Sequence, residues 1–209
     1  KVQNANYWWV APVSVQARIA FTRTKNYLPE AIRLVNESRM TITLANGSEI
    51  SFKSADNPDS LYGEDVYAAV VDEASRCKEE VWHAVRSTLT ATRGAIRIIG
   101  NVKGRKNWAY QLARKAESGI PGWRYSKITA ADAVAANVLQ ADEVVEAKRD
   151  LPEQVFKELY LAEPSDDQGN PFGVDAIYEC VAPTSSKEPV CWGWDLAKSV
   201  DWTWGIGLD

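Results

Sequence analysis

The feature that most constrains the fold is a short apolar run ending in two acids, YAAVVDEAS at residues 67–75. A continuous run of small or branched apolar residues from Ala68 to Val71 is typical of a strand buried on both faces of a parallel sheet. Open α/β sheets bind their ligands at the carboxyl ends of such strands. Asp72 and Glu73 are therefore candidate functional residues, although a strand that simply ends in solvent can carry the same two acids.

The two neighbouring carboxylates suit nucleotide hydrolysis. Asp72 could hold Mg²⁺ directly or through water, and Glu73 could orient and deprotonate the attacking water, as in a Walker B motif followed by a catalytic glutamate. A second apolar run, residues 95–99, ends in Gly100 and Asn101. Asn101 could hydrogen-bond a phosphate oxygen or the attacking water, or it could merely cap a glycine-rich strand-to-helix turn.

Strand and helix patterns alternate along most of the chain, which predicts an α/β fold. An aromatic strand at 7–10 precedes a helix at 15–27, for which Ser14 is a plausible N-cap and Gln16 is expected to face solvent. Asn46-Gly47 between two apolar runs predicts a hairpin. The polar stretch 54–63 either lines a ligand face or is a solvated connection. Further helices are expected at residues 78–89, 107–117, 131–139, 142–149 and 153–161.

The C-terminal part predicts a second unit. Residues 165–188 are acidic and contain Gly, Asn and Pro, so we expect domains at 1–164 and 189–209 with a linker at 165–188. Two runs that alternate with period two, 190–195 and 201–209, predict a hairpin. Asp195 is expected on the face opposite the tryptophans, where glycines leave room for a ligand, and such a carboxylate can begin a two-metal nuclease site. The alternative is a turn-proximal aspartate in a solvated edge hairpin.

Composition excludes several classes of protein. The net charge of −4 gives no overall basic field, so any contact with nucleic acid must be local. Lys103, Arg105 and Lys106 could contact DNA phosphates or could form a solubilising loop. The three cysteines form no CxxC pair, which argues against a disulfide framework or zinc site and favours a reducing cytoplasm. No apolar run reaches the length of about 18 residues that a membrane span needs.

Six segments, taken in order, resemble the large terminase subunit of tailed bacteriophages and prophages. They are YWWVAPVSVQA, ITLANGSEISFKSADNPDSLYG, VYAAVVDEAS, IRIIGNVKGRKNWAYQL, LPEQVFKELYLAEP and CWGWDLAKSVDWTWGIGLD. The resemblance implies an α/β fold, with a P-loop-NTPase-like parallel-sheet ATPase core followed by the first hairpin of an RNase H-like nuclease domain. It implies a motor that uses ATP hydrolysis to move double-stranded DNA into a procapsid, and a two-metal nuclease that cuts it.

The resemblance also implies roles for individual residues. Asp72 would be the Walker B acid for Mg²⁺, Glu73 the catalytic base and Asn101 the coupling residue. Asp195 would be the first metal-binding aspartate of the nuclease, with Asp201 and Asp209 as weaker candidates. The implied cofactors are ATP with Mg²⁺, and Mg²⁺ or Mn²⁺ for the nuclease. The implied partners are double-stranded DNA, portal protein, small terminase subunit and further copies in a homo-oligomeric ring, in the cytoplasm of the bacterial host and without a membrane.

One departure from the family pattern is plain. No GxxxxGK[ST] phosphate-binding loop occurs in the 209 residues. We expect this loop upstream of Lys1 and the later nuclease acids beyond Asp209, so that the chain is truncated at both ends and has little activity alone. The alternatives are a non-catalytic fragment or decayed prophage product, and another helicase-like ATPase. The hairpin predicted at 190–209 argues against the helicase-like reading.

Overall fold

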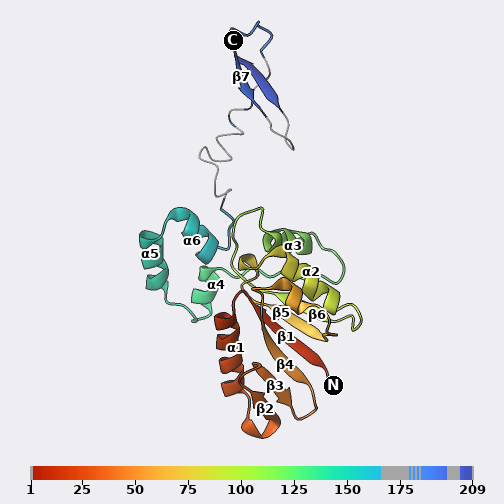
Figure 1. Ribbon diagram of the computed structural model, residues 1–209. Coiled ribbons are helices and arrows are strands. Elements are labelled where there is room, and N and C mark those ends of the chain that lie inside the picture. Colours follow the sequence, from red (N-terminus) through yellow and green to blue (C-terminus); the bar gives the residue numbers. More distant parts are fainter. Residues whose placement is uncertain are drawn as a thin grey trace. The chain divides into compact units, whose positions relative to one another are not determined.

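The computed structural model describes residues 2–165, 179, 181, 183, 185–196 and 203–208. The chain divides into two units, Lys1–Gln168 and Gly169–Asp209 (Figure 1). Most of the linker predicted at 165–188 lies outside the described residues.

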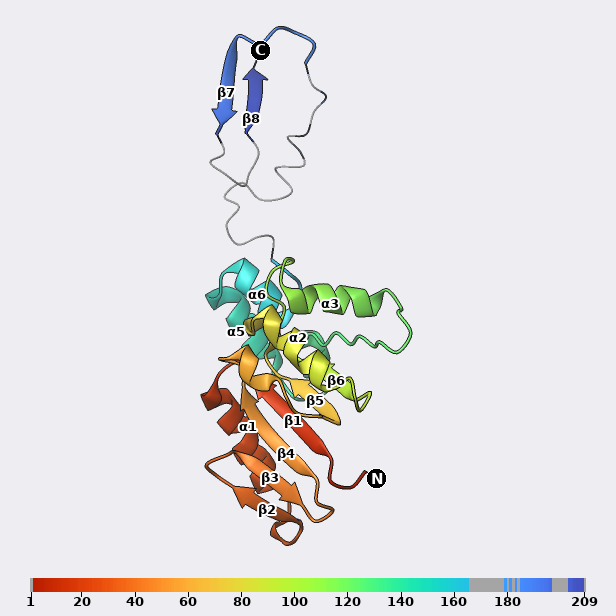
Figure 2. The same cartoon turned by 45° about the vertical axis from the view of Figure 1, so that its right-hand side comes forward.

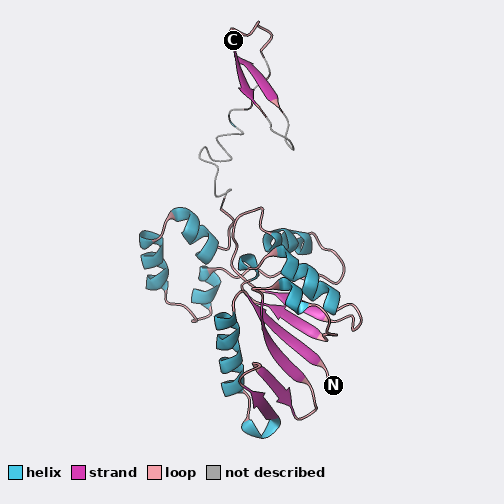
Figure 3. Cartoon of the chain, viewed as in Figure 1, coloured by secondary structure: helices cyan, strands magenta, loops and turns pink. Residues whose placement is uncertain are grey.

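The first unit is built on a six-stranded sheet in the order β2-β3-β4-β1-β5-β6 (Figure 3). Its strands are β1 (Asn6–Ala11), β2 (Arg33–Asn36), β3 (Thr41–Leu44), β4 (Glu49–Ser54), β5 (Ala68–Val71) and β6 (Ala95–Ile98). β4, β1, β5 and β6 are mutually parallel, whereas β2 and β3 add to the β4 side in antiparallel fashion. Six helices and three 3₁₀ turns join these strands or follow them. They are α1 (Ser14–Tyr27), η1 (Glu30–Ile32), η2 (Pro58–Leu61), η3 (Ala74–Arg76), α2 (Glu79–Thr88), α3 (Trp108–Glu117), α4 (Ala130–Ala135), α5 (Ala141–Asp150) and α6 (Glu153–Tyr160).

Alternate side chains of β1 point to opposite faces of the sheet and enter two different hydrophobic clusters. Trp8 and Val10 pack with β5 and α2, through residues such as Val71 and Val85. Trp9 and Ala11 pack with α1 and β4, where the rings of Phe21 and Phe52 meet edge to face at 5.5 Å. Helices therefore cover both faces of the parallel strands, as the predicted α/β fold requires.

The start of α1 differs from its predicted form. Val13 occupies the N-cap position and makes no side-chain cap, and its carbonyl accepts the Gln16 and Ala17 N–H groups. Ser14 therefore lies inside the first turn, so its prediction as N-cap is wrong. Gln16 is half-buried and its Oε1 atom is fully covered, so this side chain does not face solvent as predicted.

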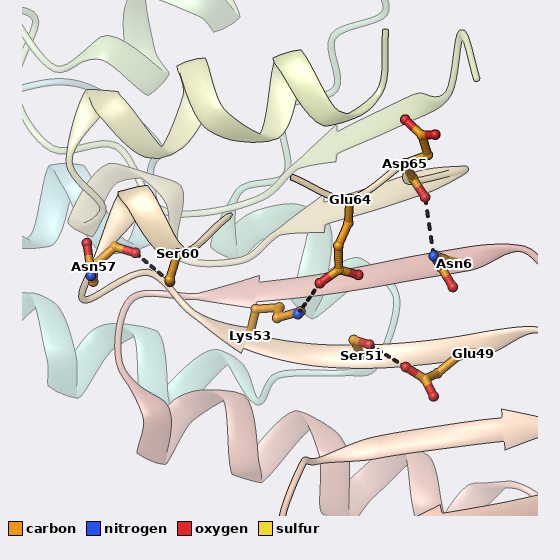
Figure 4. Close-up of polar contacts among 8 residues, drawn as sticks. All are labelled: Asn6, Glu49, Ser51, Lys53, Asn57, Ser60, Glu64 and Asp65. Atoms are coloured by element: carbon orange, nitrogen blue, oxygen red, sulfur yellow. Dashed lines mark hydrogen bonds and ion pairs between the residues drawn. The ribbon is translucent and has the colours of Figure 1, made fainter. Parts of the chain in front are cut away.

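The polar stretch before β5 is folded back against the body of the first unit. Asn57 caps η2 by accepting the Asp59 N–H, and Leu61 enters the core with only 1% of its surface exposed. Figure 4 shows Lys53 of β4 reaching the carboxylate of Glu64, at 2.9 Å between Nζ and Oε1. Leu61 attaches the stretch to the core and the Lys53–Glu64 ion pair joins the residues that flank it, while most of the stretch remains exposed.

The second unit contains an antiparallel hairpin of β7 (Cys191–Asp195) and β8 (Trp204–Leu208). The hairpin itself was predicted, but its register differs from the expectation for Asp195. Asp195 pairs with Trp204 and Gly193 with Ile206, so Asp195 shares its face with large apolar side chains of β8. Asp195 still lies on the face opposite Trp192 and Trp194, whose rings cover Gly207 and Gly205 on that other face.

Candidate functional site

The carboxyl ends of the parallel strands meet at one edge of the sheet, where the predicted acids lie. β1, β4 and β5 run side by side in the same direction (Figure 2). Asp72 and Glu73 follow β5 directly, and Asn101 follows β6 after Ile99 and Gly100. Ladder hydrogen bonds continue past the strand ends, from the Asp72 N–H to the Val10 carbonyl at 2.8 Å and from the Ala74 N–H to the Ile99 carbonyl at 2.9 Å. The backbone at this edge is therefore fixed by its neighbours.

The two acids have different surroundings although they are adjacent. Both are half-buried. One oxygen of Asp72 accepts the Glu73 N–H at 3.0 Å, which holds the carboxylate at the tip of β5. Glu73 has left-handed backbone angles, with φ 46° and ψ 42°, and its carboxylate lies 3.5 Å from the Arg76 guanidinium. Left-handed non-glycine residues cost of order 1–3 kcal/mol and cluster at functional sites.

Gly100 brings the end of β6 against the turn that carries the acids. A Cβ atom built on Gly100 would lie 3.0 Å from the Ala74 nitrogen and 3.3 Å from the Glu73 carbonyl carbon. A hydrogen atom is all that fits comfortably between these two backbones. Gly100 thus lies against the turn that contains Glu73, and the exposed Asn101 is the next residue along the chain.

Two residues at the start of α3, which sequence reasoning did not single out, hold the turn that follows Glu73 through hydrogen bonds to its carbonyl groups. The Asn107 side chain donates to the Ser75 carbonyl at 2.9 Å and also caps α3. The Trp108 indole donates to the Cys77 carbonyl at 2.8 Å and is 7% exposed. The Asn107 contact joins residues 32 positions apart in sequence, and the Trp108 contact joins residues 31 positions apart. No local pattern could have revealed them, because each depends on how α3 docks.

Cys77 lies close enough to Asp72 and Glu73 for their charges to shift the pKa of its thiol. Burial, followed by the negative charges of Asp72 and Glu73, raises the pKa of the Cys77 thiol from 9.0 to about 11. Because the pKa is raised in the folded chain, this contribution to the folding free energy is complete below pH 9. It is lost as the pH rises from 9 to about 11.

We expect Cys77 to react with iodoacetamide at pH 8 about 10–100-fold more slowly than the exposed Cys191, because Cys77 is buried and a pKa of about 11 leaves little of its thiolate at that pH. Peptide mass spectrometry on a Cys180→Ser background measures both rates. Equal rates for the two thiols at pH 8 would contradict the buried, acid-flanked setting.

The predicted basic residues lie in the loop between β6 and α3. Lys103, Arg105 and Lys106 are exposed there, a few residues after Asn101. Basic side chains continue along α3 and the loop after it. Arg114 stacks on the rings of Tyr110 and Tyr125, at 5.2 and 5.0 Å, and ion-pairs with Glu117. The edge that carries the acids is thus followed by a positively charged surface segment.

The predicted nuclease ligands are not brought together in the described part of the chain. Asp195 is exposed at the end of β7, and Asp201 and Asp209 lie outside the described residues. Among the described residues, no three or more His, Cys, Asp or Glu side chains form a group able to hold a metal ion. None of the described helices combines the length and the apolar character that a membrane crossing needs.

Comparison with known proteins gives the family. Residues 17–145, more than half of the chain, match the model of the phage terminase large subunit family. Among solved structures, the large terminase ATPase domain of Thermus phage P74-26 superposes with a TM-score of 0.64, at 24% identity, covering 78% of this chain and 78% of that chain. The large terminase of a thermophilic bacteriophage in complex with ADP gives 0.62 at 14% identity, covering 78% of this chain and 41% of that chain. Its complex with ATP-γ-S gives 0.61 at 14% identity, covering 78% of this chain and 40% of that chain. No curated protein matches the chain. The chain belongs to the phage terminase large subunit family.

Proposed function

We propose that residues 2–165 form part of the ATPase motor of a tailed phage, which uses ATP hydrolysis to move double-stranded DNA into a procapsid. The observation that carries the proposal is the placement of Asp72, Glu73 and Asn101 on adjacent parallel strand ends of a fold shared with terminase ATPase domains. Ligands of open α/β sheets bind at this edge. The large terminase in complex with ADP has the same fold, which supports a nucleotide as the ligand.

The residues at this edge fit MgATP. Mg²⁺ prefers hard oxygen ligands and is commonly held by one or two carboxylates together with substrate phosphates. Asp72 presents a half-buried carboxylate of this kind, fixed by the Glu73 N–H. When bound, the ion would neutralise charge that develops on the transferred phosphate.

Glu73 is suited to act on the water that attacks the γ-phosphate. Glu73 occupies the N-cap position of η3 with left-handed backbone angles, but its carboxylate makes no cap hydrogen bond there. The ion pair with Arg76 leaves Glu73 about one-third exposed at the sheet edge. Asn101, one strand away, would orient the same water or a phosphate oxygen through its amide.

The basic loop supports a place for DNA. Lys103, Arg105 and Lys106 would bind phosphates without reading sequence, as a translocating motor requires. In the parent protein we expect a portal protein, a small terminase subunit and other copies in a ring as partners, in the host cytoplasm. A two-metal nuclease beginning at Asp195, with Mg²⁺ or Mn²⁺, is the proposed function of the second unit.

ATP turnover, measured with and without double-stranded DNA on a sample of known intact mass, tests the proposal. Stimulation by DNA in the full-length protein supports a motor. Absence of turnover with and without DNA, in a protein that carries a phosphate-binding loop, would overturn it.

The 209-residue chain by itself should bind ATP weakly. It contains no GxxxxGK[ST] sequence, so it lacks the backbone amides and the lysine that hold the β- and γ-phosphates in P-loop proteins. Titration calorimetry with MgATP should show no saturation at micromolar nucleotide. A micromolar dissociation constant for this chain would mean that another part of it supplies the phosphate contacts.

A further inference from the structure

Glu158 is a buried carboxylate that does not belong to the proposed nucleotide site. It lies on α6 and only 9% of its surface is exposed. A buried carboxylate is costly unless donors compensate its charge. One of its oxygens, Oε1, accepts the Gly104 N–H at 2.8 Å, the Ser165 N–H at 3.2 Å and the Ser165 hydroxyl. Charge-assisted bonds of this kind are among the strongest that a protein makes.

The donors come from two segments that are far apart in sequence. Gly104 lies three residues after Asn101, in the loop that leaves the proposed nucleotide edge, and its left-handed backbone (φ 66°) aims the N–H at α6. Ser165 lies three residues before the end of the first unit at Gln168. Glu158 therefore joins the loop after β6 to the segment by which the chain leaves the first unit.

The end of α6 is shaped to make this contact. Ala162 adopts left-handed angles (φ 49°) and the Glu163 N–H returns to the Lys157 carbonyl at 3.1 Å. This turn reverses the chain, so that Ser165, with 4% of its surface exposed, comes back to the carboxylate seven positions earlier. Phe156 on the same helix is buried, with 6% exposed, and its ring stacks on Tyr160 at 5.0 Å.

The loop that carries Asn101 is held near each of its ends by other contacts. The Ile99 N–H and carbonyl are both in the ladder with Val71 and Ala74, and the Asn107 side chain binds the Ser75 carbonyl. Gly104 lies between these anchors, and its contact with Glu158 fixes the middle of the loop. A displacement of Asn101 would reach Glu158 through three residues of backbone.

We propose that Glu158 is a positioning residue that couples the loop bearing Asn101 to the exit of the chain at Ser165. The functional part of this inference rests on the proposed ATPase role of Asn101, whereas the mechanical link does not. A change at the phosphate end of the loop would be passed to Ser165 near the end of the first unit, and the reverse would also hold, because coupling between two sites is reciprocal.

Amide hydrogen exchange on the 209-residue chain without nucleotide tests the link. Glu158→Ala should speed exchange at both Gly104 and Ser165 by about 10–100-fold, the range expected when hydrogen bonds to a charged group are lost. Glu158→Gln keeps one acceptor oxygen and should fall between. The matched control, Glu153→Ala, removes an exposed acid of the same helix, paired with Lys157 at 2.7 Å, and should change neither amide.

Ser165→Ala is the sharper variant, because it leaves Glu158 and the loop intact. Coupling predicts several-fold faster exchange at Gly104, 61 positions away, and restoration by Ser165→Thr, which returns the hydroxyl. Unchanged Gly104 exchange in Ser165→Ala would overturn the link. If Glu158→Ala fails to fold, the Glu158→Gln and Ser165 variants still decide.

Turnover of the full-length protein tests the functional half. Glu158→Ala should lower kcat and leave KM for ATP unchanged, because the residue does not touch nucleotide. Exchange coupling together with an unchanged kcat would overturn the positioning role. If the unaltered full-length protein showed no turnover, the proposed ATPase activity would be wrong, whereas the exchange result would still stand.

Discussion

Replacing Glu73 by glutamine in the full-length protein should reduce ATP turnover by about 10²–10⁴-fold, the usual contribution of a positioned general base. The amide keeps the size and reach of the side chain but cannot accept the proton of the attacking water. The backbone of Glu73 already holds left-handed angles, and its only ion pair in the described structure is the partly exposed contact with Arg76. Stability should therefore change by less than about 1 kcal/mol.

The control for this result is Glu79→Gln, which removes an exposed acid on α2 whose carboxylate lies 4.0 Å from the His83 imidazole. Turnover, measured by phosphate release at saturating ATP, should remain normal in this variant. A Glu73→Gln protein that retains turnover within about threefold of the unaltered protein would remove Glu73 from the proposed mechanism. Binding of MgATP to the variant should persist, because Asp72 and the phosphate contacts are unchanged.

Replacing Phe21 by alanine should lower the free energy of unfolding of the first unit by about 3–5 kcal/mol, which is typical of a buried Phe→Ala change. Phe21 is fully buried and meets Phe52 edge to face. The other buried residue of α1 is Ala17, so this ring supplies most of the attachment of the helix to the sheet. The loss includes the aromatic contact itself and a cavity that only partly collapses.

Urea denaturation followed by far-UV circular dichroism measures the Phe21 effect, with the slope m expected to stay constant. Val15→Ala on the same helix is the matched control, since Val15 is 71% exposed and should cost no more than about 0.5 kcal/mol. A loss below about 1 kcal/mol in Phe21→Ala would show that α1 is not docked through this side chain.

Local patterns were enough to predict the framework of the sheet. The apolar runs 68–71 and 95–99 gave β5 and β6, and the runs on either side of Asn46-Gly47 gave β3 and β4, because each pattern is complete within a few residues. β2 (Arg33–Asn36) was missed because it is a short edge strand with alternating partial exposure, and pairing with β3 gives it its conformation. Its sequence alone has no strong strand signal.

The site was predictable only in part, for a related reason. Asp72 and Glu73 are visible as acids after a strand, but the left-handed turn at Glu73 has no signature in the residue type. The three contacts of Glu158 join positions up to 54 residues apart, so no spacing rule can find them. In the second unit, the alignment of β7 with β8 decides what lies beside Asp195, and shifting it by one residue exchanges the two faces.

The close approach of Gly100 to the Glu73–Ala74 turn limits which positions near the acids can be substituted. The spacing between two neighbouring loops is fixed there by main chain against main chain, so no choice of side chain can adjust it. Libraries can diversify the exposed positions Lys103 and Arg105 to alter contacts with a polyanion. Position 100 has no such freedom, because a methyl group there would require the Glu73–Ala74 backbone to yield by a few tenths of an ångström.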